Sequence, residues 1–283
     1  MARRTLASDI SVSGVALHSG AVVAMTLSPA PPGHGLIFRR SDQHGAEILA
    51  RYDRVTETRL GTVIADGEAS VGVIEHLMAA LSGAEIDDLL ITLDGPEPPI
   101  LDGDALCYLK LVEQAGVRER PATRNGIKVL KRVEVAQGEA RAALVPAAER
   151  RFDFEIVFAT PVIGRQTYSF GMTREGFGSE IAPARTFGFM NELEALNKMN
   201  LARGASLTNT LALEGDRIVN ADLMRFPDEF VRHKILDAIG DMALAGSPLI
   251  ARFEGYKSGH GLNNTLLRSL FSDPANYDIV PLP

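Results

Sequence analysis

Three polar side chains recur at every fourth position in the stretch from Arg225 to Leu244, namely His233, Asp237 and Asp241. If this stretch is helical, each step of four residues turns the side chain by only about 40°, so the three share one face. Imidazole and carboxylate groups one turn apart are a typical pair of metal ligands. We therefore predict that His233 and Asp237 bind a metal ion, with Asp241 just beyond them.

The alternative for His233 and Asp237 is a surface ion pair, which stabilises a helix by only about 0.2–0.5 kcal/mol. Apolar residues such as Val231 and Ile235 border the polar face, and this favours a metal site over a solvated surface. Lys234 flanks the same face. It could hold a phosphate or a carboxylate, although most single lysines are solvated surface charges.

A second candidate group is the adjacent pair Glu75 and His76. A lone histidine in a helix is usually a satisfied polar residue. A glutamate beside a histidine is more informative, because zinc hydrolases often place the general base next to a ligand. If His76 joins His233 and Asp237, a zinc ion has three protein ligands and an open position for water. Glu75 would then accept a proton from that water, whose pKa zinc lowers toward about 7.

His260 lies between two glycines, which allow a close backbone approach to a ligand. It is either a turn histidine without a role or a general acid that Asp241 keeps protonated near neutral pH. Thr186 follows Pro183 in an extended segment. It is either a β-branched strand residue or a hydrogen-bond donor to a developing oxyanion.

The elements that must position these residues follow one order in both halves of the chain. Several short strands precede a helix, a glycine stop, an apolar strand, a glycine-containing loop and a second helix. The first helix is predicted at Val73–Gly83, capped by Ser70, and its counterpart at Pro227–Gly246. The match is one of pattern and not of residue identity, so it is either coincidence or two α+β units that pack on each other.

A polar stretch, Arg118–Gly126, divides the halves and is predicted to be a linker. We therefore predict an N-terminal domain at residues 1–120 and a C-terminal domain at residues 126–283. The segment at about 188–219 has no counterpart in the first half, so we predict an insertion there, as a lid or a substrate channel.

Composition excludes several classes of protein. The 283 residues contain no apolar run long enough to span a membrane and no apolar region typical of a signal peptide. A single cysteine excludes an internal disulfide and any multi-cysteine zinc site, so a metal must be held by histidine and carboxylate, as in catalytic zinc sites. A net charge of -7 argues against a general nucleic-acid binder. These features predict a cytoplasmic protein.

The motifs that carry a family resemblance form five blocks in order along the chain: Gly14–Gly20, Val73–Leu77, Ala184–Met190, Phe230–Asp241 and Tyr256–Asn264. On these blocks the chain resembles the UDP-3-O-acyl-N-acetylglucosamine deacetylases, the zinc amidases of lipid A synthesis in Gram-negative bacteria. The last two blocks together are highly specific.

The resemblance implies an α+β fold of two similar two-layer sandwich domains, with the helices packed between the sheets and a βαβ-like insertion in the second domain. It implies zinc on His76, His233 and Asp237, with the site between the domains. It also implies that Glu75 is the general base and that His260 is the general acid, with Asp241 as its partner. Thr186 would donate to the oxyanion, and Lys234 would assist. Phe187 would lie beside the sugar, and Lys257 would bind the nucleotide. The insertion would line a hydrophobic passage for the acyl chain.

The chain departs from the family pattern at Asp102–Asp104, Asn191–Glu192 and Gly204–Asn209. Glu192 and Gly204–Asn209 fall in the implied substrate pocket and insertion, so they bear on sugar contacts and acyl preference. The expected substrate is a UDP-linked acylated N-acetylglucosamine, and the expected protein is a monomer that contacts the inner membrane face at most transiently. The alternative is a non-catalytic zinc- or ligand-binding protein, which would have no use for Glu75 or for the Asp241–His260 pair.

Overall fold

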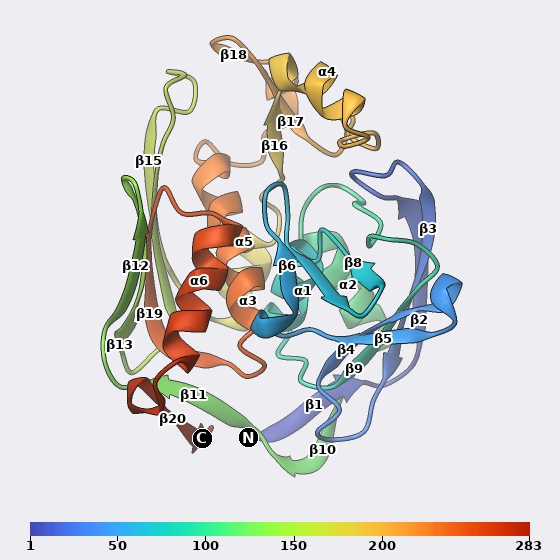
Figure 1. The fold of residues 1–283 in the computed structure, drawn as a ribbon, viewed down its shortest axis with the longest axis vertical. Coiled ribbons are helices and arrows are strands. Elements are labelled where there is room, and N and C mark those ends of the chain that lie inside the picture. The colour runs from blue at the N-terminus through green and yellow to red at the C-terminus, as the bar shows by residue number, and fades with distance from the viewer.

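Two β-sheets face each other across a layer of helices in the computed structural model, which describes all 283 residues (Figure 1). The first sheet has the strand order β2-β3-β9-β4-β5. Its strands are β2 (Ile10–Val15), β3 (Val22–Pro29), β4 (Leu36–Arg40), β5 (Ala46–Leu49) and β9 (Leu89–Leu93). The helices of this half are α1 (Glu75–Gly83) and α2 (Leu106–Ala115), and α2 lies against β2.

The second sheet has seven strands and is built around β19. Its strands are β11 (Asn125–Val129), β12 (Val133–Gln137), β13 (Ala140–Pro146), β14 (Arg151–Val157), β15 (Arg165–Gly171), β19 (Leu249–Tyr256) and β20 (Tyr277–Pro281). Three of the helices of this half are α3 (Arg174–Gly176), α5 (Glu229–Ala243) and α6 (His260–Phe271). Helix α5 packs on β14 and β15, and α6 packs on β12 and β13.

The two sheets repeat one topology. In the first half β9 lies antiparallel to β3 and parallel to β4, and each of these belongs to a hairpin, β2–β3 or β4–β5. In the second half β19 lies antiparallel to β13 and parallel to β14, again with hairpins β12–β13 and β14–β15. The same order and sense in both halves confirm the predicted pair of similar α+β sandwiches.

Each half also carries a small sheet between its second hairpin and its first long helix. In the second half this is β16 (Phe187–Phe189), α4 (Met190–Lys198), β17 (Leu211–Glu214) and β18 (Arg217–Ile218). Strands β16 and β17 are parallel with α4 between them, which confirms the βαβ-like insertion. The first half has β6 (Val55–Glu57), β7 (Val63–Asp66) and β8 (Ala69–Val71) at the equivalent place. The expectation that the insertion has no counterpart was therefore wrong.

The predicted linker is largely a strand. Residues Val117–Thr123 form β10, which pairs antiparallel with β1 (Ala2–Leu6), and a single residue, Arg124, separates β10 from β11. The charged residues of β10 are consecutive, with Arg118 and Glu119 exposed and Arg120 partly buried. We keep as a proposal that the domains are residues 1–120 and 126–283.

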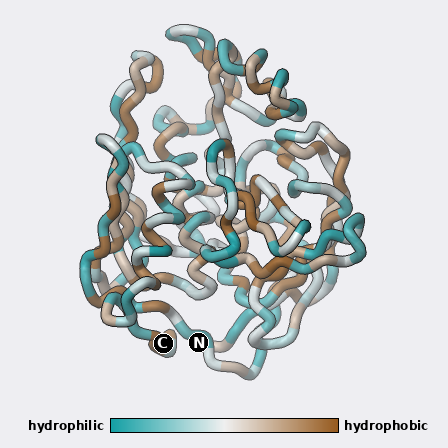
Figure 2. Tube along the Cα trace, viewed as in Figure 1, coloured by the Kyte–Doolittle hydropathy of each residue, from teal (hydrophilic) through white to brown (hydrophobic).

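Helices α1 and α5 cross at the centre of the molecule, where most side chains are buried. Figure 2 shows hydrophobic stretches on these central elements and hydrophilic stretches at many of the outer loops. Gly240 permits the crossing, because a Cβ atom there would lie 2.0 Å from the backbone oxygen of Glu75. No helix is both long and apolar enough to cross a membrane.

Two predicted helix starts were wrong by a few residues. Ser70 lies in β8, so α1 begins at Glu75 and not near Ser70. Helix α5 begins at Glu229, after Pro227. At α2 the side chain of Asp104 accepts the first-turn N–H of Cys107 at 3.1 Å.

Candidate metal centre and active site

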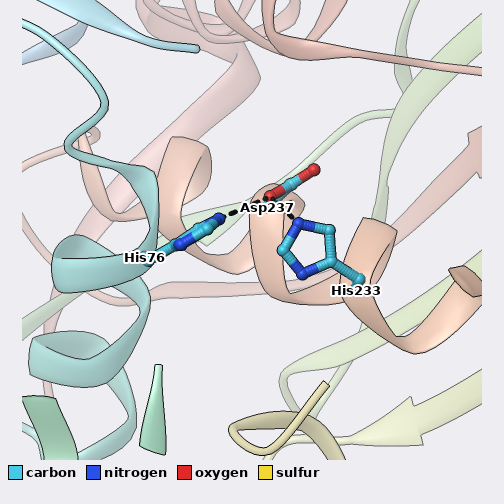
Figure 3. A group of neighbouring side chains, drawn as sticks. All are labelled: His76, His233 and Asp237. Carbon is cyan, nitrogen blue, oxygen red and sulfur yellow. Dashed lines mark ion pairs between the residues drawn. The ribbon is translucent and has the colours of Figure 1, made fainter. Parts of the chain in front are cut away.

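The first turn of α1 and the middle of α5 bring His76, His233 and Asp237 together. Asp237 Oδ1 lies 3.4 Å from His233 Nε2 and 3.7 Å from His76 Nε2. Figure 3 shows the three side chains pointing toward one another, with His76 on α1 and the other two on α5. One ligand-type atom from each lies within 4.8 Å of the others, and all three residues are buried. The spacing of four residues in α5 therefore places both polar groups where α1 presents its histidine.

The donor set fits a bound metal ion. The Ala184 carbonyl lies 3.1 Å from His233 Nδ1, and because a carbonyl only accepts, Nδ1 carries the proton and Nε2 presents a lone pair. Burial, together with the neighbouring His233, lowers the pKa of His76 to about 3, and burial lowers the pKa of His233. Both imidazoles are thus neutral at pH 7, which is the form that binds metals.

The third group of this set is a carboxylate held ionised. Burial alone would raise the pKa of Asp237, but the charge of Lys234 and the nearby histidines outweigh it and lower that pKa. Lys234 Nζ donates to Asp237 Oδ2 at 2.6 Å, which leaves Oδ1 facing the two histidines. Two imidazole nitrogens and one carboxylate oxygen are the ligand set of a catalytic zinc site.

Glu75 lies beside this group in a buried position. Its Oε2 accepts the backbone N–H of Thr62 at 2.9 Å, and its Oε1 lies 3.8 Å from His260 Nε2. Burial raises the pKa of Glu75 to about 7, against the opposing charge of His260. A carboxyl group with a pKa near neutrality is suited to both accepting and releasing a proton.

His260 is the first residue of α6 and not a loop residue as predicted. Its Nδ1 lies 2.9 Å from Asp241 Oδ2. Burial would lower the pKa of His260, but the charges of Asp241 and Glu75 outweigh it and raise that pKa to about 9. His260 is therefore an imidazolium at neutral pH, with Nδ1–H bound to Asp241 and Nε2–H directed toward the glutamate.

A cavity of 870 Å³ opens over this group. Ten of the eleven residues predicted for the site line it: Glu75, His76, Thr186, Phe187, Glu192, His233, Lys234, Asp237, Lys257 and His260. The eleventh, Asp241, lies behind His260 and is 3% exposed, so it acts only through that histidine.

Side chains from the insertion and its flanks form one wall of the cavity. The ring of Phe187 contacts Phe230 and Phe158 edge-on at 5.0 and 5.7 Å and lies 6.1 Å from the His233 ring. Apolar residues of the insertion continue that wall: Phe189, Met190, Leu193, Leu196 and Leu207. Glu192 is exposed at the rim.

Lys257 is also at the cavity, with its Nζ bonded to Glu139 at 2.8 Å. This bond uses one of the three N–H donors of the lysine, which leaves two for a ligand.

Sequence reasoning missed two residues that hold Asp241. Thr62 donates through its hydroxyl to Asp241 Oδ1 at 2.6 Å, and Asn263 donates through its amide to Oδ2 at 2.8 Å. Asn263 lies three residues after His260, so helical spacing could have indicated it. Thr62 lies just before β7 in the first half, and no local pattern signals a contact across 179 residues.

Comparisons with known proteins agree with this geometry. The family model for UDP-3-O-acyl N-acetylglycosamine deacetylase matches residues 3–272. The chain belongs to this family. It is similar to the UDP-3-O-acyl-N-acetylglucosamine deacetylase of Myxococcus xanthus, with 48% identity over 99% of this chain and 89% of the relative. It is also similar to the enzyme of the same name from Phenylobacterium zucineum, with 44% identity over 97% of this chain and 94% of the relative. The corresponding protein of Neisseria meningitidis serogroup A is 44% identical over 99% of this chain and 93% of the relative.

The family consists of metalloenzymes, and the chain offers two groups with ligand-type atoms close together. The second group, Asp102, Asp104 and Cys107, fits a metal poorly. Asp104 is ion-paired with Arg225. Burial raises the pKa of the Cys107 thiol to about 12, so the thiolate that a metal needs does not form at neutral pH. The group of His76, His233 and Asp237 is therefore the one suited to the metal of a deacetylase of this family.

Proposed function

We propose that this chain removes the acetyl group from UDP-3-O-acyl-N-acetylglucosamine with zinc held by His76, His233 and Asp237. The deacetylase activity, a hydrolytic step of lipid A biosynthesis, follows from membership of the family. The single observation that carries the residue assignment is the convergence of two histidine Nε2 atoms on one oxygen of Asp237, beside a buried glutamate. When bound, zinc supplies a Lewis acid that polarises the amide carbonyl and makes water more acidic.

Glu75 is the general base of this proposal. Its Oε1 is the carboxylate oxygen not bonded to the Thr62 N–H, so it is free to accept a proton from the attacking water. With a pKa raised to about 7 by burial, Glu75 is a stronger base than an ordinary carboxylate and is still ionised in a large fraction of molecules at neutral pH.

His260 is the general acid. Amide cleavage produces an amine that leaves only after its nitrogen is protonated, and His260 carries a proton on Nε2. Asp241 orients the ring through Nδ1 and stabilises the imidazolium. Thr62 and Asn263 fix Asp241 in turn, so the acid is positioned by elements from both halves.

The remaining assignments concern the substrate. Thr186 Oγ1 donates to the developing oxyanion, and Lys234, which also lines the cavity, assists at the carbonyl or the diphosphate side of the substrate. Phe187 forms an aromatic wall beside the sugar, and the apolar side chains of the insertion contact the acyl chain. Lys257 binds the nucleotide end, and Glu192 contacts the substrate at the rim. We keep the cytoplasmic location, the monomeric state and transient contact with the inner membrane face as predictions.

The test is acetate release from UDP-3-O-acyl-N-acetylglucosamine by the purified protein. We expect release that stops after a chelator removes the metal and returns when zinc is added. The other candidate function, a non-catalytic zinc-binding protein, predicts zinc binding without acetate release. The Glu75 and Asp241–His260 groups argue against it, because binding alone requires neither. Acetate release that persists in fully metal-free protein would contradict the zinc assignment.

A further inference from the structure

A second cavity, of 350 Å³, lies away from the candidate active site. It shares no lining residue with the first cavity. The first half contributes strands β4 and β5 and the end of α1, and the second half contributes β13, β14, β19 and the end of α5. Because the lining comes from both halves, a molecule bound here would touch both.

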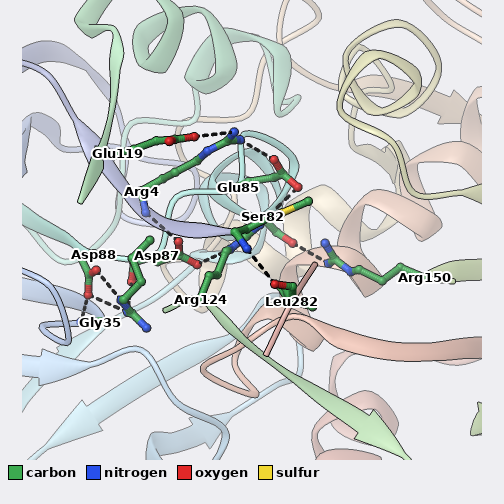
Figure 4. Close-up of polar contacts among 12 residues, drawn as sticks. Arg4, Gly35, Ser82, Glu85, Asp87, Asp88, Glu119, Arg124, Arg150 and Leu282 are labelled. Atoms are coloured by element: carbon green, nitrogen blue, oxygen red, sulfur yellow. Dashed lines mark hydrogen bonds and ion pairs between the residues drawn. The ribbon is translucent and has the colours of Figure 1, made fainter. Parts of the chain in front are cut away.

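Several arginines lie at this cavity, and most have carboxylate partners. Arg3 pairs with Asp88 at 2.7 Å, and Arg124 pairs with Asp87 at 2.8 Å and Glu85 at 3.3 Å. Figure 4 shows these contacts as one connected cluster. The carboxylates nearest the cavity are thus each held by an arginine already.

Arg150 differs from the other arginines of this cluster. No carboxylate lies within ion-pair distance of its guanidinium, and its one side-chain hydrogen bond runs from Nη2 to Ser82 Oγ at 3.0 Å (Figure 4). A guanidinium has five N–H donors, so most of the hydrogen-bonding capacity of Arg150 is unused by the protein. Burial, with the nearby charge of Arg124, lowers the pKa of Arg150 to about 10, which still leaves it charged at neutral pH.

One role that needs no ligand is open to Arg150, because Ser82 lies in the last turn of α1 and a cation there complements the helix dipole. That role does not explain the cavity or its apolar lining. About half of the lining residues are hydrophobic. They include Leu144, Phe152 and Phe253 on the second sheet and Leu36 on the first.

We propose that this cavity binds a small organic anion, with a carboxylate or phosphate head on Arg150 and a short apolar body against Phe152 and Phe253. A carboxylate or phosphate matches the fork of a guanidinium and would satisfy its unused donors. The volume lies within the range of small-molecule pockets and exceeds what a simple inorganic anion fills.

The test is isothermal titration calorimetry on the zinc-loaded, full-length enzyme. Hexyl phosphate and hexanoate are the two head-group probes, inorganic phosphate is the head alone, and 1-hexanol is the body alone. We expect at least one of the two amphiphilic anions to bind more tightly than both inorganic phosphate and hexanol, and the tighter one identifies the head. No binding by either anion, or equal binding of hexanol, would overturn the proposal.

The decisive variant is Arg150→Gln. The anion loses charge-assisted hydrogen bonds in this variant, so we expect its affinity to fall at least about tenfold. Arg252→Gln is the matched control, because Arg252 lies outside the cavity, pairs with Asp153 and Glu254, and should leave affinity unchanged. Equal affinity in Arg150→Gln and wild type would overturn the site.

Two further measurements guard against a folding defect. Arg150→Gln should release acetate at the wild-type rate, because Arg150 lies outside the catalytic cavity. If that variant does not fold, a crystal structure of the wild-type enzyme with the probe decides the question. Density for the head group within hydrogen-bond distance of Arg150 supports the proposal, and density for the probe elsewhere overturns it.

Discussion

Helices α1 and α5 occupy equivalent places in the two halves, yet they serve the candidate site differently. In α1 only the first turn is polar, with Glu75 and His76, and the rest of the helix is largely buried apolar side chains. In α5 buried polar residues run along the helix, from Glu229 through His233 and Asp237 to Asp241. Equivalent helices of the two halves thus contribute different groups to the candidate site.

Because the two helices contribute different groups, the site depends on the contact between the halves. Helix α5 alone holds two of the three proposed ligands and the partner of the acid, so most of the geometry of the candidate site is set within one helix. Helix α1 adds the third ligand and the base, and its position relative to α5 is set by packing at Gly240. Removing groups from each helix in turn therefore separates metal binding from proton transfer.

The largest effect is expected from loss of a metal ligand in either helix. His233→Ala in α5 and His76→Ala in α1 should both lose bound zinc, and kcat/KM should fall on the order of a thousandfold or more, since a Lewis acid supplies several kcal/mol. Metal content by mass spectrometry and acetate release check this. Full zinc occupancy in either variant would remove that residue from the ligand set.

Glu75→Gln separates the two functions that α1 contributes. The variant should retain zinc, because His76 is intact, while kcat falls by about 10²–10⁴ through loss of the base. The measurement is zinc content together with steady-state acetate release. Unchanged turnover would mean that Glu75 is not the base, and loss of zinc would mean that it acts on the metal site instead.

The dependence of kcat/KM on pH reports on both the base in α1 and the acid that Asp241 of α5 supports. Glu75 must be ionised, and since its pKa is raised to about 7, activity should fall as pH drops through that value. His260 must be protonated, and since its pKa is raised to about 9, activity should fall as pH rises through that value. A cation bound beside Glu75 moves the acidic limb to lower pH. A bell-shaped kcat/KM curve is expected, and a profile without a basic limb argues against His260 as the acid.

The smallest effect is expected from Gly240→Ala, which removes no catalytic side chain but presses on the backbone of Glu75 at the contact between the helices. The added methyl group would overlap the backbone of Glu75, so the free energy of unfolding should fall by about 1–3 kcal/mol. Gly171→Ala is the control, because a Cβ atom there meets nothing within 4 Å. Denaturant unfolding of both variants checks this, and equal stability would mean that the crossing tolerates a side chain.

The same contrast explains what could be predicted from the sequence. The stripe in α5 follows from the helical period, and the Glu75–His76 pair follows from adjacency, so both are local signals. One partner of Asp241 is not local, because Thr62 reaches it from the position just before β7 in the first half. Strand β10 was mistaken for a linker, since its charged residues resemble a polar loop when the pairing with β1 is unknown.

Anomalous scattering at the zinc edge from a crystal of the zinc-loaded protein tests the central claim most directly. The claim is that one metal ion joins a ligand from α1 to two from α5. We expect a single strong peak at about 2.0–2.2 Å from His76 Nε2, His233 Nε2 and an oxygen of Asp237. A peak bound by α5 residues without His76, or located at Asp102, Asp104 and Cys107, would contradict it.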